Sequence, residues 1–281
     1  MNTKDIIRKP IVAGTFYPGK VQDLEETILN LLNSSTSEHL TGEIYGLVSP
    51  HAGYIYSGKI AADAYKQLRG KSYDNVIVIS PSHFDEFTGC SVFFGNYKTP
   101  LGVIPTNVEL AEAIVSFSPN IIESTKGHLR EHSLEVQLPF LQLVLDNFNL
   151  IPIAMGSQDY TTANELSIAI NAAISKPEFT NQKTLIVGSS DLSHYFPVEK
   201  ANQLDNVVLK DIEDFDEKKL FSDINSNRCQ ACGSGPIYAA MITSKRLGAE
   251  HSKIISYGTS GDHSRDYSSV VGYLSSVFYS N

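Results

Sequence analysis

Three short apolar runs in this sequence are each followed by a histidine: residues 44–48 before His51, residues 76–79 before His83, and residues 185–187 before His194. Short runs rich in β-branched residues are typical of buried strands. In open α/β sheets, the loops at the carboxyl ends of the strands form the crevice in which ligands bind. We therefore expect the three histidines to converge at one edge of a sheet.

Converging imidazoles suggest a transition-metal site. Neutral imidazole suits iron, copper, zinc and nickel, whereas magnesium and calcium are bound mainly by oxygen. Cys232 precedes an expected helix at 235–247, whose N-terminus would lower the pKa of the thiol and favour a metal-binding thiolate. A small buried residue in a tight loop explains Cys232 equally well, and we expect Cys90 and Cys229 to be buried thiols of that kind.

Several residues near these motifs are candidates for moving protons or for contacting a ligand. His194 could be a ligand or a general base, because histidine titrates near neutral pH. Asp191 could be a ligand or could orient an imidazole. Tyr54, Tyr56 and Tyr195 could line a pocket for an aromatic or polar ligand, although a tyrosine is more often a core residue whose hydroxyl is bonded.

The segment 131–145 is expected to form a helix that is kinked or restarted at Pro139. On one face of that helix, His132 would be an acid/base group and Glu135 would orient it. A capped helix start with charges facing solvent explains the same pattern equally well. The pattern lacks the second histidine of the zinc-protease motif.

The rest of the chain alternates helices with strands. Helical patterns occur at 21–32, 59–68, 164–174 and 198–215, and one further helix is capped by Thr106 or Asn107. Strands are expected at 150–155, 254–258 and 269–277. A hairpin is expected to pair 91–94 with 102–104. This alternation predicts one α/β domain over residues 1–281, with a central mixed sheet flanked by helices on both faces.

Composition narrows the class of protein. The 281 residues, 42% of them hydrophobic, are enough to bury one large core or two modest ones. The net charge of −9 disfavours nucleic acid and anionic membrane as partners, and no stretch is long and apolar enough to span a bilayer. Three cysteines, an odd number, suit a reducing compartment. We therefore expect a cytoplasmic protein.

The motifs at residues 13–18, 50–58, 81–83, 131–140, 190–195 and 258–262 resemble those of the MEMO family (mediator of ErbB2-driven cell motility). The resemblance covers essentially the whole chain. Prokaryotic members of that family are described as component B of the AmmeMemoRadiSam system. The resemblance implies a fold similar to that of the class III, LigB-type extradiol dioxygenases, which cleave catechol rings with non-haem iron(II).

The resemblance also implies a set of site residues: His51 and His83 as metal ligands, Cys232 completing the site, and Asp191, His194 and His132 facing the same pocket. It implies iron(II) or copper, with zinc less favoured. The dioxygenases bind their metal with two histidines and a carboxylate. A thiolate is softer, tolerates copper(I) better and can itself be oxidised. Ring cleavage therefore does not follow from the fold.

These features support three hypotheses about function. The first is a metal-dependent redox or oxygen-activating protein, in which His194, Asp191 and His132 handle protons. The second is a non-catalytic module that binds a peptide or partner protein in the same cleft. The third is a zinc metallohydrolase. Expected partners are a small-molecule or peptide ligand and a radical-SAM protein.

Overall fold

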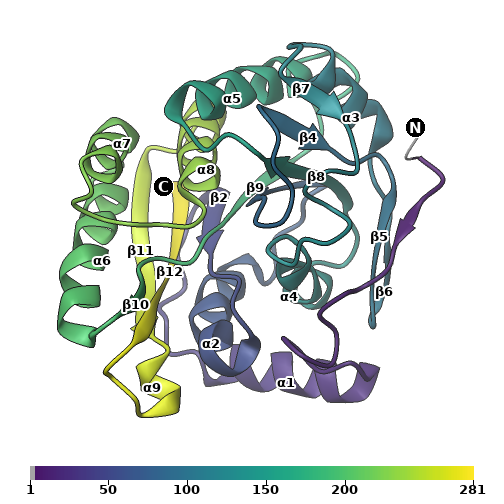
Figure 1. Ribbon diagram of the computed structural model, residues 1–281. Helices are drawn as coiled ribbons and strands as arrows, with labels where there is room; N and C mark the ends of the chain where they lie inside the picture. Colours follow the sequence, from purple (N-terminus) through teal and green to yellow (C-terminus); the bar gives the residue numbers. More distant parts are fainter. Residues whose placement is uncertain (1–3) are drawn as a thin grey trace.

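A computed structural model describes residues 4–281, which contain a nine-stranded mixed sheet and a separate three-stranded sheet (Figure 1). The large sheet has the order β10-β12-β2-β9-β3-β8-β4-β7, and β11 pairs with β12. Its strands are β2 (Glu43–Ser49), β3 (Asn75–Pro81), β4 (Cys90–Val92), β7 (Ile121–Glu123), β8 (Asn149–Met155), β9 (Thr184–Ser189), β10 (His194–Phe196), β11 (His251–Thr259) and β12 (Val270–Ser280). Strands β2, β9, β3 and β8 run parallel, whereas β12 is antiparallel to β2.

The central strands are buried on both faces, which explains their continuous apolar sequence. Successive side chains of a strand point to opposite faces. In β3, Val76 and Val78 belong to one core cluster, and Ile77 and Ile79 belong to the other. The sheet therefore separates two hydrophobic cores.

Helices cover both faces of the sheet (Figure 1). One layer contains α1 (Val21–Ser34), α2 (Tyr54–Tyr65) and α4 (Leu138–Val144), and the other contains α3 (Val108–Val115), α5 (Tyr160–Ile174), α6 (Val198–Glu213), α7 (Glu217–Asn225) and α8 (Ser234–Leu247). The short helices are η1 (Lys66–Leu68), η2 (Glu135–Gln137) and α9 (Gly261–Ser264). The predicted α/β architecture, a mixed sheet between two helical layers, is confirmed. Within residues 4–281, no helix has the length and apolar character needed to cross a membrane.

The predicted hairpin was assigned to the wrong strands. Strand β4 lies in the large sheet between β8 and β7, and the hairpin pairs β5 (Asn96–Thr99) with β6 (Gly102–Ile104) beside β1 (Ile7–Arg8). Every residue of β4 is buried, as a strand between two others requires, whereas β5 and β6 include exposed residues. The turn at 99–102 was predicted correctly.

Several predicted helix boundaries are also wrong. Residues 131–132 are irregular and 133–134 form a turn instead of a helix, and Pro139 lies in the first turn of α4 instead of kinking a helix. A proline is tolerated there because its missing N–H would have no partner in the helix. Helix α2 starts at Tyr54, earlier than predicted, and the helix predicted at 198–215 ends at Glu213 and is followed by α7.

Glu135 joins the N-terminal segment to the body of the protein. Its fully buried carboxylate pairs with the Arg8 guanidinium and accepts hydrogen bonds from the Ile11 and Val12 N–H groups and from the Tyr17 hydroxyl. A buried carboxylate with this many donors is well compensated for its desolvation. Neither of the two sequence-based interpretations of Glu135, as the group that orients His132 or as a solvent-facing charge, is correct.

Candidate metal centre

The register of three parallel strands brings the candidate residues together. Gly188 of β9 lies between Val48 of β2 and Ile79 of β3. The loops that follow these strands carry Asp191, His51 and His83, respectively. The imidazole rings of His51 and His83 are 5.2 Å apart between centroids. The predicted convergence of these two histidines at one edge of the sheet is therefore present in the fold.

Cys232 comes to the same edge from the turn before α8. Gly188 allows this approach, because a Cβ at that position would lie 2.8 Å from the Pro236 carbonyl oxygen in the first turn of α8. The Cys232 N–H donates to the Asp191 carbonyl at 3.1 Å, and the Asp191 N–H donates to the Cys232 Sγ at 3.3 Å. One potential ligand atom from each of His51, His83 and Cys232 lies within 4.8 Å of the others.

A chain of hydrogen bonds determines which ring nitrogen of His51 carries the proton. The Ser189 hydroxyl donates to the Ser133 carbonyl at 2.7 Å and accepts from the Gln137 amide at 2.9 Å. Since its only proton is used, Ser189 must accept from His51 Nδ1–H, at 2.9 Å. The unprotonated Nε2 of His51 then faces the Cys232 Sγ at 3.3 Å. His51 is thus prepared to bind a metal through Nε2.

Electrostatics favour the neutral form of His51. Burial, followed by the nearby His83 and His132 rings, lowers its pKa well below the usual value. A neutral imidazole is the form that binds metal. Burial has the opposite effect on Cys232, since it raises the pKa of the thiol and outweighs the hydrogen bonds of its turn. The prediction that the helix N-terminus lowers this pKa is therefore wrong.

Glu131 is the acidic group that contacts His83 and His132. One of its oxygens accepts from the His83 N–H at 2.6 Å, and the other accepts from the His132 and Ser133 N–H groups and lies 3.0 Å from His83 Nδ1. Burial alone would raise its pKa, but these bonds and the charge of His83 lower it to about 2. His83, Glu131 and His132 are also close enough to bind a metal. We assign no metal to that group, because N–H donors already occupy the carboxylate.

Asp191 and His194 are suited to holding protons. Asp191 accepts the His51 N–H at 2.8 Å, and burial raises its pKa to about 7. The His194 Nδ1 lies 2.7 Å from the Leu192 carbonyl oxygen, which can only accept, so Nδ1 carries the proton and Nε2 is the free base. Burial lowers the pKa of His194, which keeps the ring neutral. His194 is partly exposed and begins the edge strand β10, a short loop after β9, close enough to His51 and His83 to interact with them electrostatically.

The three tyrosines differ in their surroundings. Tyr54 is buried, packs against Phe140, and donates its hydroxyl to the Val136 carbonyl at 2.8 Å, so we assign it to the core. Tyr56 and Tyr195 are 44% and 77% exposed. Tyr195, beside His194, has a φ of 64°, the left-handed region that side chains rarely adopt. These two rings, and not Tyr54, are available to a ligand.

Cys90 and Cys229 are buried in the core, as expected, and all three cysteines are free thiols. Three important residues were missed: Glu131, Ser189 and Gln137. Ser189 directly follows an apolar run and so could have been found by the rule that identified His51. Glu131 could not be distinguished from Glu135, because only tertiary contacts determine which of them faces the histidines.

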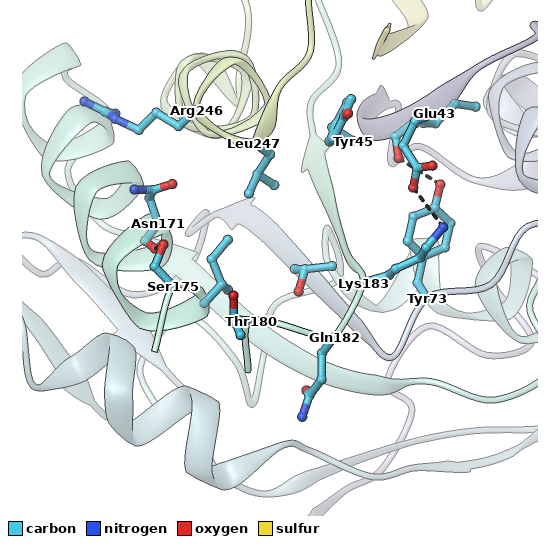
Figure 2. A pocket seen from close by; sticks show the side chains of 13 residues that line it. Glu43, Tyr45, Tyr73, Asn171, Ser175, Thr180, Gln182, Lys183, Arg246 and Leu247 are labelled. Atoms are coloured by element: carbon cyan, nitrogen blue, oxygen red, sulfur yellow. Dashed lines mark hydrogen bonds and ion pairs between the residues drawn. The ribbon is translucent and has the colours of Figure 1, made fainter. Parts of the chain in front are cut away.

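A cavity of about 300 Å³ lies at the opposite end of the sheet, near the amino ends of β2 and β9 (Figure 2). The two cations on its wall are already engaged. Lys183 pairs with Glu43 at 3.2 Å, and Arg246 donates to the Ser167 hydroxyl at 2.7 Å. This cavity contains none of the candidate metal ligands.

Fold and site together define a class of protein: an α/β protein with a histidine–cysteine cluster at the carboxyl edge of its parallel strands. The chain belongs to the Memo-like protein family, whose sequence profile matches residues 8–277. A MEMO1 family protein of Methanobrevibacter smithii is 42% identical, with 97% of this chain and 100% of the relative aligned. A MEMO1 family protein of Nitrosopumilus maritimus is 38% identical, with 95% of this chain and 98% of the relative aligned. The resemblance seen in the motifs is confirmed.

The fold also resembles a solved structure, that of the uncharacterized protein JW3007 from Escherichia coli K12. The TM-score is 0.50, and the alignment covers 84% of this chain and all of the other. The two sequences are 13% identical, so this similarity concerns the fold alone.

Gly233 offers a test of the Cys232 turn. A Cβ at Gly233 would lie 2.2 Å from the Ser189 carbonyl oxygen, so Gly233→Ala must move the turn. We expect metal affinity to fall by about tenfold or more, as when the groups that orient ligands are disturbed. Titration with cobalt(II) measures this affinity. As a control, Gly53→Ala should bind like wild type, because its nearest contact would be an ordinary 3.5 Å; equal losses in both variants would contradict this account.

Proposed function

We propose that this MEMO family protein binds one iron(II) or copper ion through His51, His83 and Cys232 and uses it for redox or oxygen-activating chemistry. The main support is the approach of three ligand atoms to within 4.8 Å at the carboxyl edge of the sheet. Two neutral imidazoles and a thiolate suit iron and copper, whereas magnesium and calcium need oxygen ligands. The bound ion would act as a Lewis acid and redox centre.

The surrounding residues supply proton transfer. The free Nε2 of His194 can take a proton from a hydroxyl of the ligand, and the Asp191 carboxyl, whose pKa is about 7, can hold or release one near neutral pH. His132 lies 5.6 Å from His51 between ring centroids, and its ring is neutral because burial lowers its pKa. It is a second acceptor beside the two histidine ligands, 5.3 Å from the His83 ring between centroids.

A non-catalytic binding function is the alternative, and exposed aromatic rings support it. Tyr56, Tyr195 and Phe84 are 44%, 77% and 56% exposed, and Phe84 lies 6.1 Å from the His132 ring. Exposed aromatic groups near a site are typical of surfaces that bind peptides or proteins. Under this alternative the occupant is a peptide or a radical-SAM protein, and binding persists without metal. In both cases we propose a cytoplasmic location, which the three free thiols support.

Metal content tests the proposal. Protein purified without oxygen under reducing conditions should contain about one iron or copper per chain, and His51→Ala and Cys232→Ala should lose it, because each removes one of only three ligands. Cys229→Ala is the matched control: this thiol belongs to the same Cys-x-x-Cys sequence but is buried in the core, so the variant should retain metal. Elemental analysis measures all four proteins.

If wild-type protein contains no metal and none can be reconstituted, the proposal is wrong and the binding function is favoured. Stoichiometric zinc with ester or amide hydrolysis would instead support a metallohydrolase. Metal retained equally in Cys232→Ala and Cys229→Ala would exclude Cys232 as a ligand.

Metal affinity should rise with pH. Burial, and then the Asp191 charge, raises the pKa of Cys232, so a metal must displace the thiol proton and affinity should increase about tenfold per pH unit. Burial lowers the pKa of His83, but Glu131 outweighs this and raises it, so a second proton is displaced when the metal binds below that pKa. Calorimetry in buffers of different ionisation enthalpy counts these protons. Affinity independent of pH between about 6 and 8 would contradict a Cys232 ligand.

A further inference from the structure

We infer that Glu131 is a positioning residue that orients His83 so that its Nε2 is presented to the metal. The inference rests on the proposed metal-binding function and adds a group that no motif assigned. His83 needs such a group, because its side chain is 30% exposed. The side chain of His51 is only 3% exposed and is fixed by its hydrogen bond to Ser189.

The carboxylate of Glu131 binds His83 at two points. The main-chain N–H of His83 donates to one carboxylate oxygen at 2.6 Å, and the ring Nδ1 lies 3.0 Å from the other. Main-chain N–H groups donate to both oxygens of this carboxylate, so both act as acceptors and Nδ1 of His83 carries the proton. This leaves Nε2 as the only nitrogen of His83 that can bind a metal.

His51 is oriented in the same way by a different group. Its Nδ1–H donates to the Ser189 hydroxyl, and its Nε2 faces Cys232. Both histidines therefore use Nδ1 for orientation and Nε2 for the metal, an arrangement common to histidine ligands in metalloproteins. For His83 the partner is a full negative charge, which also makes the imidazole a stronger ligand.

Glu131 is itself rigid, as a positioning group must be. Its side chain is 1% exposed, its carboxylate accepts the N–H groups of His132 and Ser133, and its own carbonyl accepts from the Arg8 guanidinium. The side chain of Glu131 thus connects the loop after β3, which carries His83, to the segment that carries His132. Movement of Glu131 would displace both rings.

Glu131→Gln tests the assignment. An amide cannot accept from all of these donors, so the His83 ring loses its fixed orientation. We expect the affinity for cobalt(II), read from the thiolate-to-metal absorption band, to fall about 10- to 100-fold. The matched control is Glu135→Gln, which alters a carboxylate that is also buried and lies in the same segment. That carboxylate pairs with Arg8 and bonds neither His83 nor His132. This control should lose stability while keeping wild-type cobalt affinity.

A spectroscopic measurement on the wild-type protein covers the case in which Glu131→Gln does not fold. In nitrogen-15-labelled protein loaded with zinc, the His83 ring, assigned by its absence from His83→Ala, should show a metal-bound Nε2 and a protonated Nδ1. Coordination through Nδ1, or an Nδ1 without its proton, would overturn the assignment.

The outcomes separate the two claims. If the wild-type protein binds no cobalt, the proposed metal function fails and the role of Glu131 fails with it. If the wild-type protein binds cobalt and folded Glu131→Gln binds it equally well, only the assignment of Glu131 fails. A loss of affinity in Glu131→Gln that is matched in Glu135→Gln would also refute it, because the effect would then come from general destabilisation.

Discussion

The register of β2, β9 and β3 is the constraint on which the candidate site depends. Val48, Gly188 and Ile79 lie side by side, so the next residues of three different segments leave the sheet at one place. A shift of one residue would also move every side chain to the other face, which two buried cores forbid. The same interactions that bury the apolar residues thus determine the positions of His51 and His83.

The site also illustrates how hydrogen-bond donors and a nearby cation together offset burial in setting the charge of a buried acid. Glu131 accepts three main-chain N–H groups and the His83 ring, and its pKa falls to about 2. Asp191 has the His51 N–H as its main donor, and burial raises its pKa to about 7. The protein thereby places an ionised carboxylate, Glu131, against His83 and a titratable carboxyl, Asp191, against His51. A single site thus has both a fixed orienting charge and a group able to exchange protons.

The sequence predicts the large features because they depend on periodicity and chain topology. Apolar runs followed by His51 and His83 identify strands and their ligand-bearing ends, and Asn107 caps α3 as expected, with its side chain accepting the Leu110 N–H. The sequence does not separate Glu131 from Glu135, since both carboxylates are buried and only their tertiary partners differ. It also misjudges Cys232, because burial raises the pKa of this thiol by more than the hydrogen bonds of its turn lower it.

The most direct test of the central claim is X-ray absorption spectroscopy at the edge of whichever metal the anaerobically purified protein contains. Coordination by His51, His83 and Cys232 predicts one sulfur neighbour at about 2.3 Å and imidazole nitrogens at about 2.0–2.1 Å, distances typical of such ligands. The sulfur contribution should be absent from Cys232→Ala reconstituted with excess metal and present in Cys229→Ala. A spectrum of the wild-type protein with only oxygen and nitrogen neighbours would contradict the account.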